Sequence, residues 1–542
     1  MTFFSQGSGV NGPAIKASHV FLLLIAAVTG AAPIFDNDLF WTLATGRWII
    51  EHGAMLPQPD PFTWTAVSRD VAHEWLTQVF LASVEAVAGL SALRILCGLI
   101  TAGAVHLVIQ AFRKAGAPHA VAVAAAAAWW LLVEPHAVLR PHLFGWILFI
   151  WFAGYLFSKP DPEKRFRWIW MVAGMILWAN AHGSIFSLPV YSGLMLVEVC
   201  AAGAVYRKFE KKTARDWAVI TACALAACLV QPAGFRLIGY VLETQSINQN
   251  NINEWMPLWQ MDVWHSRPWI WIIYLIVLAA FAAVAVLKHD RRMHLIFPGV
   301  LPVCLGFIHS MNTRRMTLFL FLALLFILRF LPESLKKAAG TSPWKYMAAV
   351  AVAATLGLTM PRVSASLKEG ALRQGVFPEM AVAFLDVTRL KGHLFNRDGW
   401  GGFITWKLHP HYQNFLDGRW PVIGKKVLSD HVRMTIRKDA GDLFEAYAIE
   451  VFIEDAEHYY SAPPPGNDGW WLAWGDETAV VLIRKGPNLD YNTKSICSFY
   501  EQRPGLRPMA TWPLAVKSKD GKPTPVDIPS LLERCGAPQA SK

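Results

Sequence analysis

Residues 17–41 have the sequence ASHVFLLLIAAVTGAAPIFDNDLFW, in which an apolar run from Ala17 to Phe35 is followed at once by Asp36 and Asp38. The run is long enough to cross a bilayer. A carboxylate at the rim of a membrane is costly to hold there, and such residues are usually functional. This boundary therefore predicts both a membrane span and a candidate site at its outer end.

The composition extends this prediction to the whole chain. Of its 542 residues, 54% are hydrophobic, 16% are charged and 25 are tryptophan, which is too apolar for an ordinary soluble protein. We count about eleven apolar runs with the length of a span, from Ala17–Phe35 to Tyr346–Met360. The first run lacks the small-residue cleavage site of a signal peptide, so we expect it to be retained. The sequence thus predicts a polytopic α-helical membrane protein.

The basic clusters indicate the orientation of the spans. They all fall on one side if the amphipathic stretch from Trp75 to Leu90 lies in the interface and does not cross. That side is cytoplasmic by the positive-inside rule. Residues 1–16 are then cytoplasmic, residues 17–360 form the membrane domain with an external loop at 36–90, and residues 361–542 are external. This topology explains the net charge of +11 and requires no nucleic-acid partner.

Residues 361–542 have the composition of a soluble domain with room for its own core. We expect an amphipathic helix at Pro378–Leu390 and strands at 393–395, 414–416 and 479–483, which together predict an α/β domain. Cys497 and Cys535 lie in this tail, and a disulfide between them would suit an oxidising compartment. No cysteine spacing resembles a zinc site.

The external loop joins the acid pair to two helices expected at the membrane surface. Asp36-Asn37-Asp38 leads into a helix-compatible stretch, Thr42 to Glu51, which stops at His52-Gly53. His73-Glu74 then opens the second of these helices. The same outer face receives further polar residues from distant spans and loops, namely Arg140, His142, His182, Glu254, Arg314 and Arg315.

This layout resembles the GT-C class of membrane glycosyltransferases, which includes the protein O-mannosyltransferases and the lipid A aminoarabinose transferases. The resemblance rests on one short-tailed span, an acid pair at its outer end, two surface helices and a following span with an Arg-Lys end. The motifs that share it are Asp36-Asn37-Asp38, Arg140-Pro141-His142, Trp178-Ala179-Asn180-Ala181-His182-Gly183, Glu254-Trp255, Trp400-Gly401-Gly402 and Asp417-Gly418-Arg419. Many relatives carry an acid where this chain has Arg140-Pro141-His142.

The resemblance implies a multi-pass enzyme of a bacterial inner membrane, with its C-terminal domain in the periplasm. Such an enzyme transfers a sugar from a polyprenyl-phosphate donor in the lipid to a glycan, lipid or protein acceptor on the external face, and inversion at the sugar is expected.

The residues also fit that chemistry when the resemblance to the family is left aside. Displacing a phosphate from an anomeric carbon requires a base for the acceptor hydroxyl and positive charge for the departing phosphate. Asp36 or Asp38 can supply the base. Candidates for the charge are Arg140, His142, His182, Arg314 and Arg315, and His73, Glu74 and Glu254 are further site candidates. Asp-x-Asp would also suit a divalent cation such as Mg²⁺ or Mn²⁺.

Other interpretations of the same residues stay open. Asp36 and Asp38 are also suited to capping the following helix, and the glycine motifs of the tail also serve tight turns. The spans could instead form a transporter or flippase for a lipid-linked sugar, although no repeated halves stand out. A non-catalytic subunit of a glycan assembly system is the third alternative, because fold does not fix function.

Overall fold

The computed structural model describes residues 13–68, 70–156, 166–248, 269–287, 299–310, 313–334, 342–436, 440–461, 469–503, 506 and 535. The chain divides into two compact units. The first comprises Met1–Ile34, Val71–Phe80 and Val84–Ala371, and the second comprises Phe35–Asp70, Leu81–Ser83 and Leu372–Lys542. The sequence-based division kept residues 36–90 with the membrane domain, whereas the contacts assign Phe35–Asp70 to the unit that holds the C-terminal residues.

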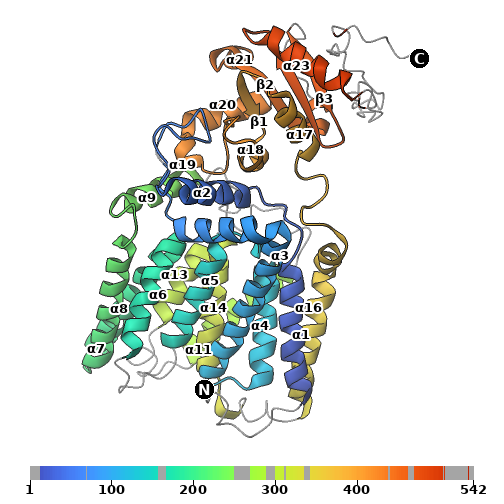
Figure 1. The fold of residues 1–542 in the computed structure, drawn as a ribbon. Coiled ribbons are helices and arrows are strands. Elements are labelled where there is room, and N and C mark those ends of the chain that lie inside the picture. The colour runs from blue at the N-terminus through green and yellow to red at the C-terminus, as the bar shows by residue number, and fades with distance from the viewer. Residues whose placement is uncertain are drawn as a thin grey trace. The chain divides into compact units, whose positions relative to one another are not determined.

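The first unit is helical (Figure 1). Its α-helices are α1 (Pro13–Gly30), α3 (Trp75–Lys114), α4 (His119–Val133), α5 (His142–Leu156), α6 (Phe166–Ala181), α7 (Ser187–Val205), α8 (Lys211–Leu229), α9 (Arg236–Asn248), α11 (Trp269–Leu287), α13 (Val300–Ser310), α14 (Thr313–Arg329) and α16 (Ser342–Lys368). Two 3-10 turns, η1 (Glu134–His136) and η2 (Gly183–Phe186), follow α4 and α6. Helices α1, α4 and α16 pack together, and α7 packs on α8.

Helix α3 consists of two segments that meet at Gly89. This residue has φ 72° and ψ −176°, a backbone conformation outside the helical region that glycine adopts without strain. The two segments run in different directions in Figure 1. The break confirms that the helix expected at Trp75–Leu90 is separate from the apolar run that follows it. Its position in the membrane interface stays a prediction.

The predicted spans Ala17–Phe35 and Tyr346–Met360 overlap α1 and α16, but the number of crossings stays a prediction. Within the described ranges, five helices are long and apolar enough to cross a bilayer: Pro13–Gly30, Trp75–Lys114, Gly183–Val205, Trp269–Val286 and Tyr346–Lys368. Shorter apolar helices occur at His142–Gly154, Trp168–Ala181 and Leu320–Arg329.

Two arginines hold helix ends together in the first unit. Arg362 of α16 forms an ion pair of 3.0 Å with the buried Glu134 and donates to the carbonyls of Thr29 and Ala137. Arg94 of α3 donates to the carbonyl of Ser366 in the last turn of α16 and to carbonyls just beyond the ends of α1 and α16, including Ala31 O at 2.9 Å. The last carbonyls of a helix lack partners within it, so these guanidinium groups satisfy them and tie three helices to one another.

The second unit combines helices with a mixed sheet. Its strands are β1 (His393–Asn396), β2 (Ile449–Asp455), β3 (Trp470–Gly475) and β4 (Ala479–Arg484), in the order β1-β2-β4-β3. β1 and β2 are parallel, and β4 pairs antiparallel with β2 and with β3. The helices are α2 (Asp38–His52), α17 (Glu379–Thr388), η5 (Asp398–Trp400), α18 (Gly401–Leu408), α19 (Trp420–Ile423), α20 (Lys425–Thr435), α21 (Gly441–Ala446), α22 (Ala456–Ser461) and α23 (Leu489–Glu501).

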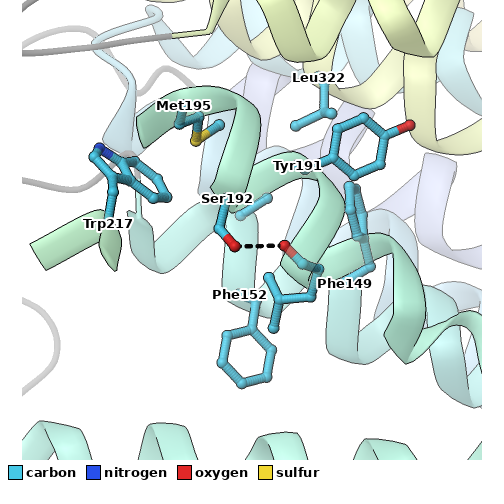
Figure 2. A pocket seen from close by; sticks show the side chains of 9 residues that line it. Phe149, Phe152, Tyr191, Ser192, Met195, Trp217 and Leu322 are labelled. Atoms are coloured by element: carbon cyan, nitrogen blue, oxygen red, sulfur yellow. Dashed lines mark hydrogen bonds between the residues drawn. The ribbon is translucent and has the colours of Figure 1, made fainter. Parts of the chain in front are cut away.

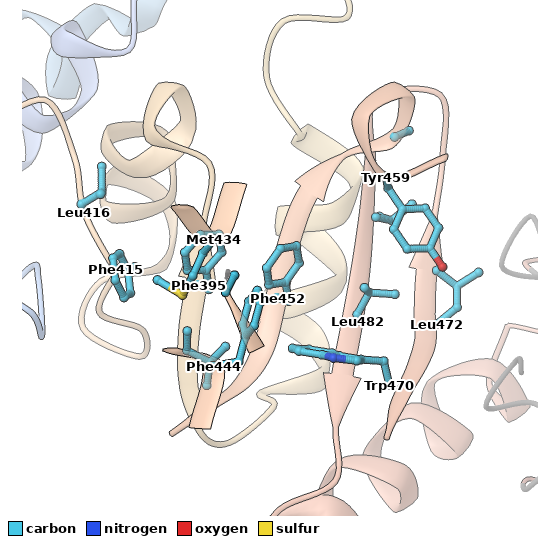
Figure 3. Close-up of a cluster of buried hydrophobic side chains, with 14 of the residues drawn as sticks. Phe395, Phe415, Leu416, Met434, Phe444, Phe452, Tyr459, Trp470, Leu472 and Leu482 are labelled. Carbon is cyan, nitrogen blue, oxygen red and sulfur yellow. The ribbon is translucent and has the colours of Figure 1, made fainter. Parts of the chain in front are cut away.

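An aromatic core fills this unit (Figure 3). Phe395 of β1 stacks on Phe452 of β2 with ring centroids 4.8 Å apart, and Trp470 of β3 meets Phe452 edge-on at 5.6 Å. Strand β4 is buried along almost its whole length, which accounts for its continuous run of apolar residues. Burial of these large side chains is the main stabilising contribution of the unit.

Helix α2 belongs to this unit because its apolar face packs on α18. Phe40 lies against Phe377, Phe403 and Trp406, with centroid distances of 4.9, 5.1 and 5.0 Å. The predicted stop at His52-Gly53 is confirmed, since Gly53 is left-handed and donates to Ile49 O at 2.9 Å. This packing is the physical reason why Phe35–Asp70 separates from the membrane helices.

Local predictions for the tail are mostly confirmed. The helix at Pro378–Leu390 and the strands at 393–395 and 479–483 correspond to α17, β1 and β4. The strand expected at 414–416 is wrong: Asn414 forms only an isolated bridge with Thr63, and its buried side chain donates to Gly401 O. The disulfide between Cys497 and Cys535 is formed, with the Cα atoms 5.4 Å apart.

Candidate functional site

The acid pair lies at the start of α2 in the second unit. Asp36 is buried, and its Oδ1 accepts the backbone N–H of Asp38 at 3.0 Å. Asp38 is half-buried, and its Oδ1 accepts from Trp41 Nε1 at 3.1 Å. Asn37 stands at the N-cap without a capping hydrogen bond from its side chain. Asp36 therefore has the capping role that the sequence left open, whereas Asp38 bonds a side chain within the first turn.

Both glycine motifs of the tail meet this acid pair. A Cβ atom at position 418 would lie 2.2 Å from Asp38 Oδ1, and one at 402 would lie 2.5 Å from the carbonyl oxygen of Asn37. The Asn37 side chain accepts from Phe403 N at 3.2 Å and donates to Asp398 O at 3.4 Å. These positions require glycine because of close approach to the acid motif. The three motifs quoted from the sequence thus form one cluster.

Asp398 is a further member of this cluster that sequence reasoning missed. It is half-buried, and its Oδ1 accepts from Trp420 Nε1 at 3.2 Å. Burial raises the pKa of its carboxyl from 3.8 to about 6, and the negative charges of Asp38 and Asp417 add to the rise. The available signal was its position as the one acid in the turn-rich stretch Asn396-Arg397-Asp398-Gly399-Trp400-Gly401-Gly402.

Arg419 pairs with three acids of the second unit, Asp60, Asp70 and Asp417. Its guanidinium is 2% exposed and contacts Asp60 at 2.7 Å, Asp417 at 2.8 Å and Asp70 at 3.4 Å. Burial opposes the ionisation of Asp417, but the Arg419 charge and hydrogen bonds outweigh it and hold the pKa of Asp417 below its usual value. Because every N–H of this guanidinium is engaged, the residue is structural.

A second polar group lies in the first unit, at the junction of α6 and η2. Glu74, which precedes α3, is buried, and its Oε1 lies 3.1 Å from His182 Nε2 and 3.4 Å from His73 Nε2. The Nδ1 atom of His182 accepts from Ser184 N at 3.0 Å, which orients the ring. Glu74 makes no capping hydrogen bond to α3. Three of the predicted site candidates are therefore brought together.

His142 lies close to this group, with its ring centroid 6.4 Å from that of His182. Its Nε2 is hydrogen-bonded to His136 O at 2.9 Å. Arg140 is half-buried in the turn before α5, where its backbone N–H donates to Val138 O at 2.8 Å.

The remaining predicted residues lie partly or wholly outside the described part of the structure. Arg314 and Arg315 lie in the first turn of α14, and their side chains are outside the described part of the structure. Glu254 lies outside the described residues. The predicted members are thus distributed over both units: Asp36 and Asp38 belong to the second, and the histidines and arginines belong to the first. Whether they share one cavity stays a prediction.

The donor set for a divalent metal is incomplete. Among the described residues no group of three or more His, Cys, Asp or Glu side chains is arranged to hold an ion. Oδ1 of Asp36 and Oδ1 of Asp38 already accept hydrogen bonds from Asp38 N and Trp41. A divalent cation at Asp36 and Asp38 stays a prediction, and no step below passes through one.

The apolar pocket between α5, α7, α8 and α14 is too small for a substrate (Figure 2). Its volume of about 20 Å³ is room for about one water molecule. It is lined by apolar and aromatic side chains together with Ser192, whose hydroxyl donates to Leu188 O at 2.7 Å. This pocket is a small packing gap in the first unit.

Comparisons with known proteins place the fold. No family model and no curated protein sequence matches the chain. Among solved structures, the chain is similar to the oligosaccharyltransferase AglB from Archaeoglobus fulgidus, in complex with an inhibitory peptide and a dolichol-phosphate. That match has 12% identity and a TM-score of 0.50, and it covers 83% of this chain and 71% of AglB.

Two further structures match with lower scores. A second Archaeoglobus fulgidus oligosaccharyltransferase structure, a complex with Zn and sulfate, has 11% identity and a TM-score of 0.43, with 86% and 73% of the two chains covered. ArnT from Cupriavidus metallidurans, bound to undecaprenyl phosphate, has 11% identity and a TM-score of 0.46, with 88% and 98% covered. The likeness to AglB extends over most of both chains, and the chain therefore has the GT-C membrane fold that its sequence resembles.

Proposed function

We propose that this chain is a membrane glycosyltransferase that moves a sugar from a polyprenyl-phosphate donor to a hydroxyl of an acceptor on the external face of a bacterial inner membrane. The fold supports a lipid-linked donor, because AglB, which shares it, was solved with a dolichol-phosphate. The observation that carries the proposal is the meeting of Asp36-Asn37-Asp38 with the two glycine motifs of the tail around the carboxylates of Asp38 and Asp398.

The reaction requires one displacement. The acceptor hydroxyl gives its proton to a carboxylate while its oxygen bonds to the anomeric carbon, and the bond from that carbon to the phosphate oxygen breaks. A single displacement inverts the anomeric configuration. A general base works best with a pKa near the operating pH. In the pair of Asp38 and Asp398, the second residue meets that condition, with a pKa of about 6. We assign the base to this pair, with Asp36 as the residue that fixes the turn.

The departing phosphate requires positive charge or hydrogen-bond donors. In the first unit, His73 and His182 lie within 3.4 Å of one carboxylate oxygen of Glu74, with His142 beside them. Imidazole N–H groups can donate to phosphate oxygens, and Glu74 holds two of these rings beside each other. We assign donor-phosphate binding to these histidines, together with Arg140, Arg314 and Arg315 from the sequence. The acceptor hydroxyl belongs to a glycan, a lipid or a protein.

The test replaces Asp38 and Asp36 separately by Asn in the full chain. Asp386, an exposed acid of α17 paired with Arg389, provides the matched control Asp386→Asn. Transfer of labelled sugar from lipid-linked donor and release of polyprenyl phosphate are both measured in membranes. We expect Asp38→Asn to slow both by about 100-fold or more, as for loss of a general base, and Asp386→Asn to leave them unchanged.

Asp36→Asn should have a smaller effect, because an amide oxygen can still accept the Asp38 N–H. If Asp38→Asn and Asp36→Asn both express normally and transfer sugar at the parental rate, the assignment is wrong. If labelled sugar crosses the membrane without release of polyprenyl phosphate in the parent, the chain is a flippase and the proposed reaction is abandoned.

A further inference from the structure

Two indole N–H groups bind the two acids to which the base is assigned. Trp41 Nε1 donates to Asp38 Oδ1 at 3.1 Å, and Trp420 Nε1 donates to Asp398 Oδ1 at 3.2 Å. The two tryptophans belong to segments far apart in the chain, since Trp41 lies in α2 and Trp420 begins α19. Both acids therefore accept through Oδ1 from the same kind of donor.

The cage around Arg419 determines where Trp420 lies. Arg419 is almost fully buried and is bound by three carboxylates, and Trp420 is the next residue in the chain. The carbonyl of Arg419 accepts from Val422 N at 2.8 Å, which fixes the start of the short helix α19. Asp398 is held independently, because Asn37 Nδ2 donates to its carbonyl at 3.4 Å. The indole and the carboxyl thus meet as two anchored groups.

The same unit contains an indole–carboxylate contact with a structural role. Trp474 Nε1 donates to Asp476 Oδ2 at 2.9 Å, and Oδ1 of Asp476 accepts from the backbone of Thr478 and Ala479 at 2.7 and 2.8 Å. Both oxygens of Asp476 therefore serve the turn between β3 and β4. Oδ2 of Asp398, in contrast, accepts no hydrogen bond from any residue that the structure describes, and it is not a fully buried atom. A bound hydroxyl can therefore reach it.

The charged groups that act on the Asp398 carboxyl come from three segments. Burial raises its pKa to about 6, and the charges of Asp38 in α2 and Asp417 before α19 add to the rise. The hydrogen bond from Trp420 lowers this pKa, and it opposes the rise more than the charge of Arg397 does. Loss of the indole N–H would therefore raise the pKa of Asp398 further.

Resting on the proposed function, we propose that Trp420 is a positioning residue of the base, whose indole N–H fixes Oδ1 of Asp398 and leaves Oδ2 open to the acceptor hydroxyl. In the transfer step, the hydroxyl proton passes to the acid pair, the acceptor oxygen bonds to the anomeric carbon, and the bond from that carbon to the phosphate oxygen breaks. Trp420 exchanges no proton and contacts neither substrate. It holds one orientation of the carboxyl and favours its ionised form, which is the form that accepts a proton.

The first measurement is the pH dependence of sugar transfer by the full chain in membranes. Trp420→Phe removes the N–H and keeps an aromatic ring, so the acid limb of kcat/KM should move up by about 1 pH unit. Transfer should fall by about tenfold below that limb, and it should return to the parental rate at high pH, where Asp398 is ionised in both proteins. Trp474→Phe is the matched control, because it removes the same kind of bond from Asp476 and should leave the profile unchanged.

The second measurement does not depend on catalysis. An acid whose folded-state pKa lies above its ordinary value of 3.8 lowers stability as the pH rises from that value to the folded-state pKa. Trp420→Phe should extend this loss to higher pH, so between about pH 5 and 8 its unfolding equilibrium constant should rise by about tenfold more than that of the parent. Denaturant unfolding of the full chain measures this. In the Asp398→Asn background, Trp420→Phe should have no pH-dependent effect.

A second variant guards against loss of the fold. Incorporation of 3-benzothienylalanine at position 420 keeps the bicyclic shape without the N–H and should reproduce both effects of Trp420→Phe. The proposal is overturned if the acid limb stays at the parental pH, if transfer drops by one factor at every pH, or if the unfolding effect persists in Asp398→Asn. If the parent transfers no sugar, the proposed function fails, and the unfolding measurements still decide whether Trp420 controls the protonation of Asp398.

Discussion

Replacing Arg419 should lower the stability of the second unit, because this residue is structural and takes no direct part in the proposed reaction. The guanidinium is almost fully buried and holds three carboxylates, those of Asp60, Asp70 and Asp417, at 2.7 to 3.4 Å. Arg419→Met keeps much of the side-chain volume but removes the charge and every donor. The three acids are then left in a buried site with no counter-charge on their former partner.

The magnitude follows from the cost of an uncompensated buried charge. Removing one partner of a buried ion pair destabilises a protein by about 3–5 kcal/mol, and a typical domain has only about 5–15 kcal/mol of stability. Arg419→Met should therefore remove a large share of the stability of this unit. Arg419→Lys should be intermediate, because an ammonium keeps the charge but cannot form the planar fork that reaches Asp60 and Asp417 together.

Unfolding of the purified full chain in detergent, followed by tryptophan fluorescence against denaturant, measures the effect. Protease sensitivity of residues 372–542 reports whether the loss is local to this unit. Arg484→Met is the matched control, because Arg484 pairs with the exposed Glu445 and such pairs contribute only about 0–1 kcal/mol. If Arg419→Met unfolds within about 1 kcal/mol of the parent, the buried cage does not hold the unit together and the reasoning fails.

Two further predictions concern the site acids. Asp398→Asn should raise the free energy of unfolding at pH 7.5 by up to about 3 kcal/mol, because a folded-state pKa of about 6 against 3.8 means that the ionised carboxyl is disfavoured on folding. This gain should shrink as the pH falls from about 6 toward 3.8, and it should vanish only below that pH, where the carboxyl is protonated in both states. Denaturant unfolding of variant and parent across that range measures it, and a pH-independent difference would contradict it. Glu74→Gln should raise the KM for the lipid-linked donor about tenfold, the effect of losing about one hydrogen bond to a charged group that positions the imidazoles, with little change in kcat. Donor-dependence kinetics in membranes measure this against Glu210→Gln, which alters a surface pair with Lys208, and an unchanged KM would remove Glu74 from donor binding.

Local signals in the sequence predicted local structure well. Helix α2 and its stop at Gly53 follow from an apolar stretch bounded by Asp and Gly, and β4 follows from a short, continuous apolar run. The prediction of a strand at 414–416 was wrong for the opposite reason. The hydrogen bonds of Asn414 go to residues far along the chain, including the backbone of Phe62. The alternation of apolar and polar residues that predicts a strand carries no information about such partners.

The sequence predicted only some of the site residues, for the same physical reason. Asp36 and Asp38 stood out because charge at the end of an apolar run is unusual. Asp60 did not stand out, because it lies in the proline-rich stretch Pro57-Gln58-Pro59-Asp60-Pro61, which is typical of a rigid turn. Its partner Arg419 lies 359 positions further along the chain. Periodicity reports which face of an element is buried, but it does not report which distant segment covers that face.

The two environments in the second unit give the strongest argument for where the chemistry lies. Burial acts on both Asp417 and Asp398, yet the Arg419 charge and hydrogen bonds lower the pKa of Asp417, while burial, only partly offset by Trp420 and Arg397, raises that of Asp398 to about 6. Acids whose environments push their pKa values apart have different roles. An acid fixed in its charged form within a cage can stabilise a turn but cannot exchange a proton near neutral pH. Asp398, coupled to Asp38 at the start of α2, can do so, and the base of a transfer reaction is therefore to be sought in that pair.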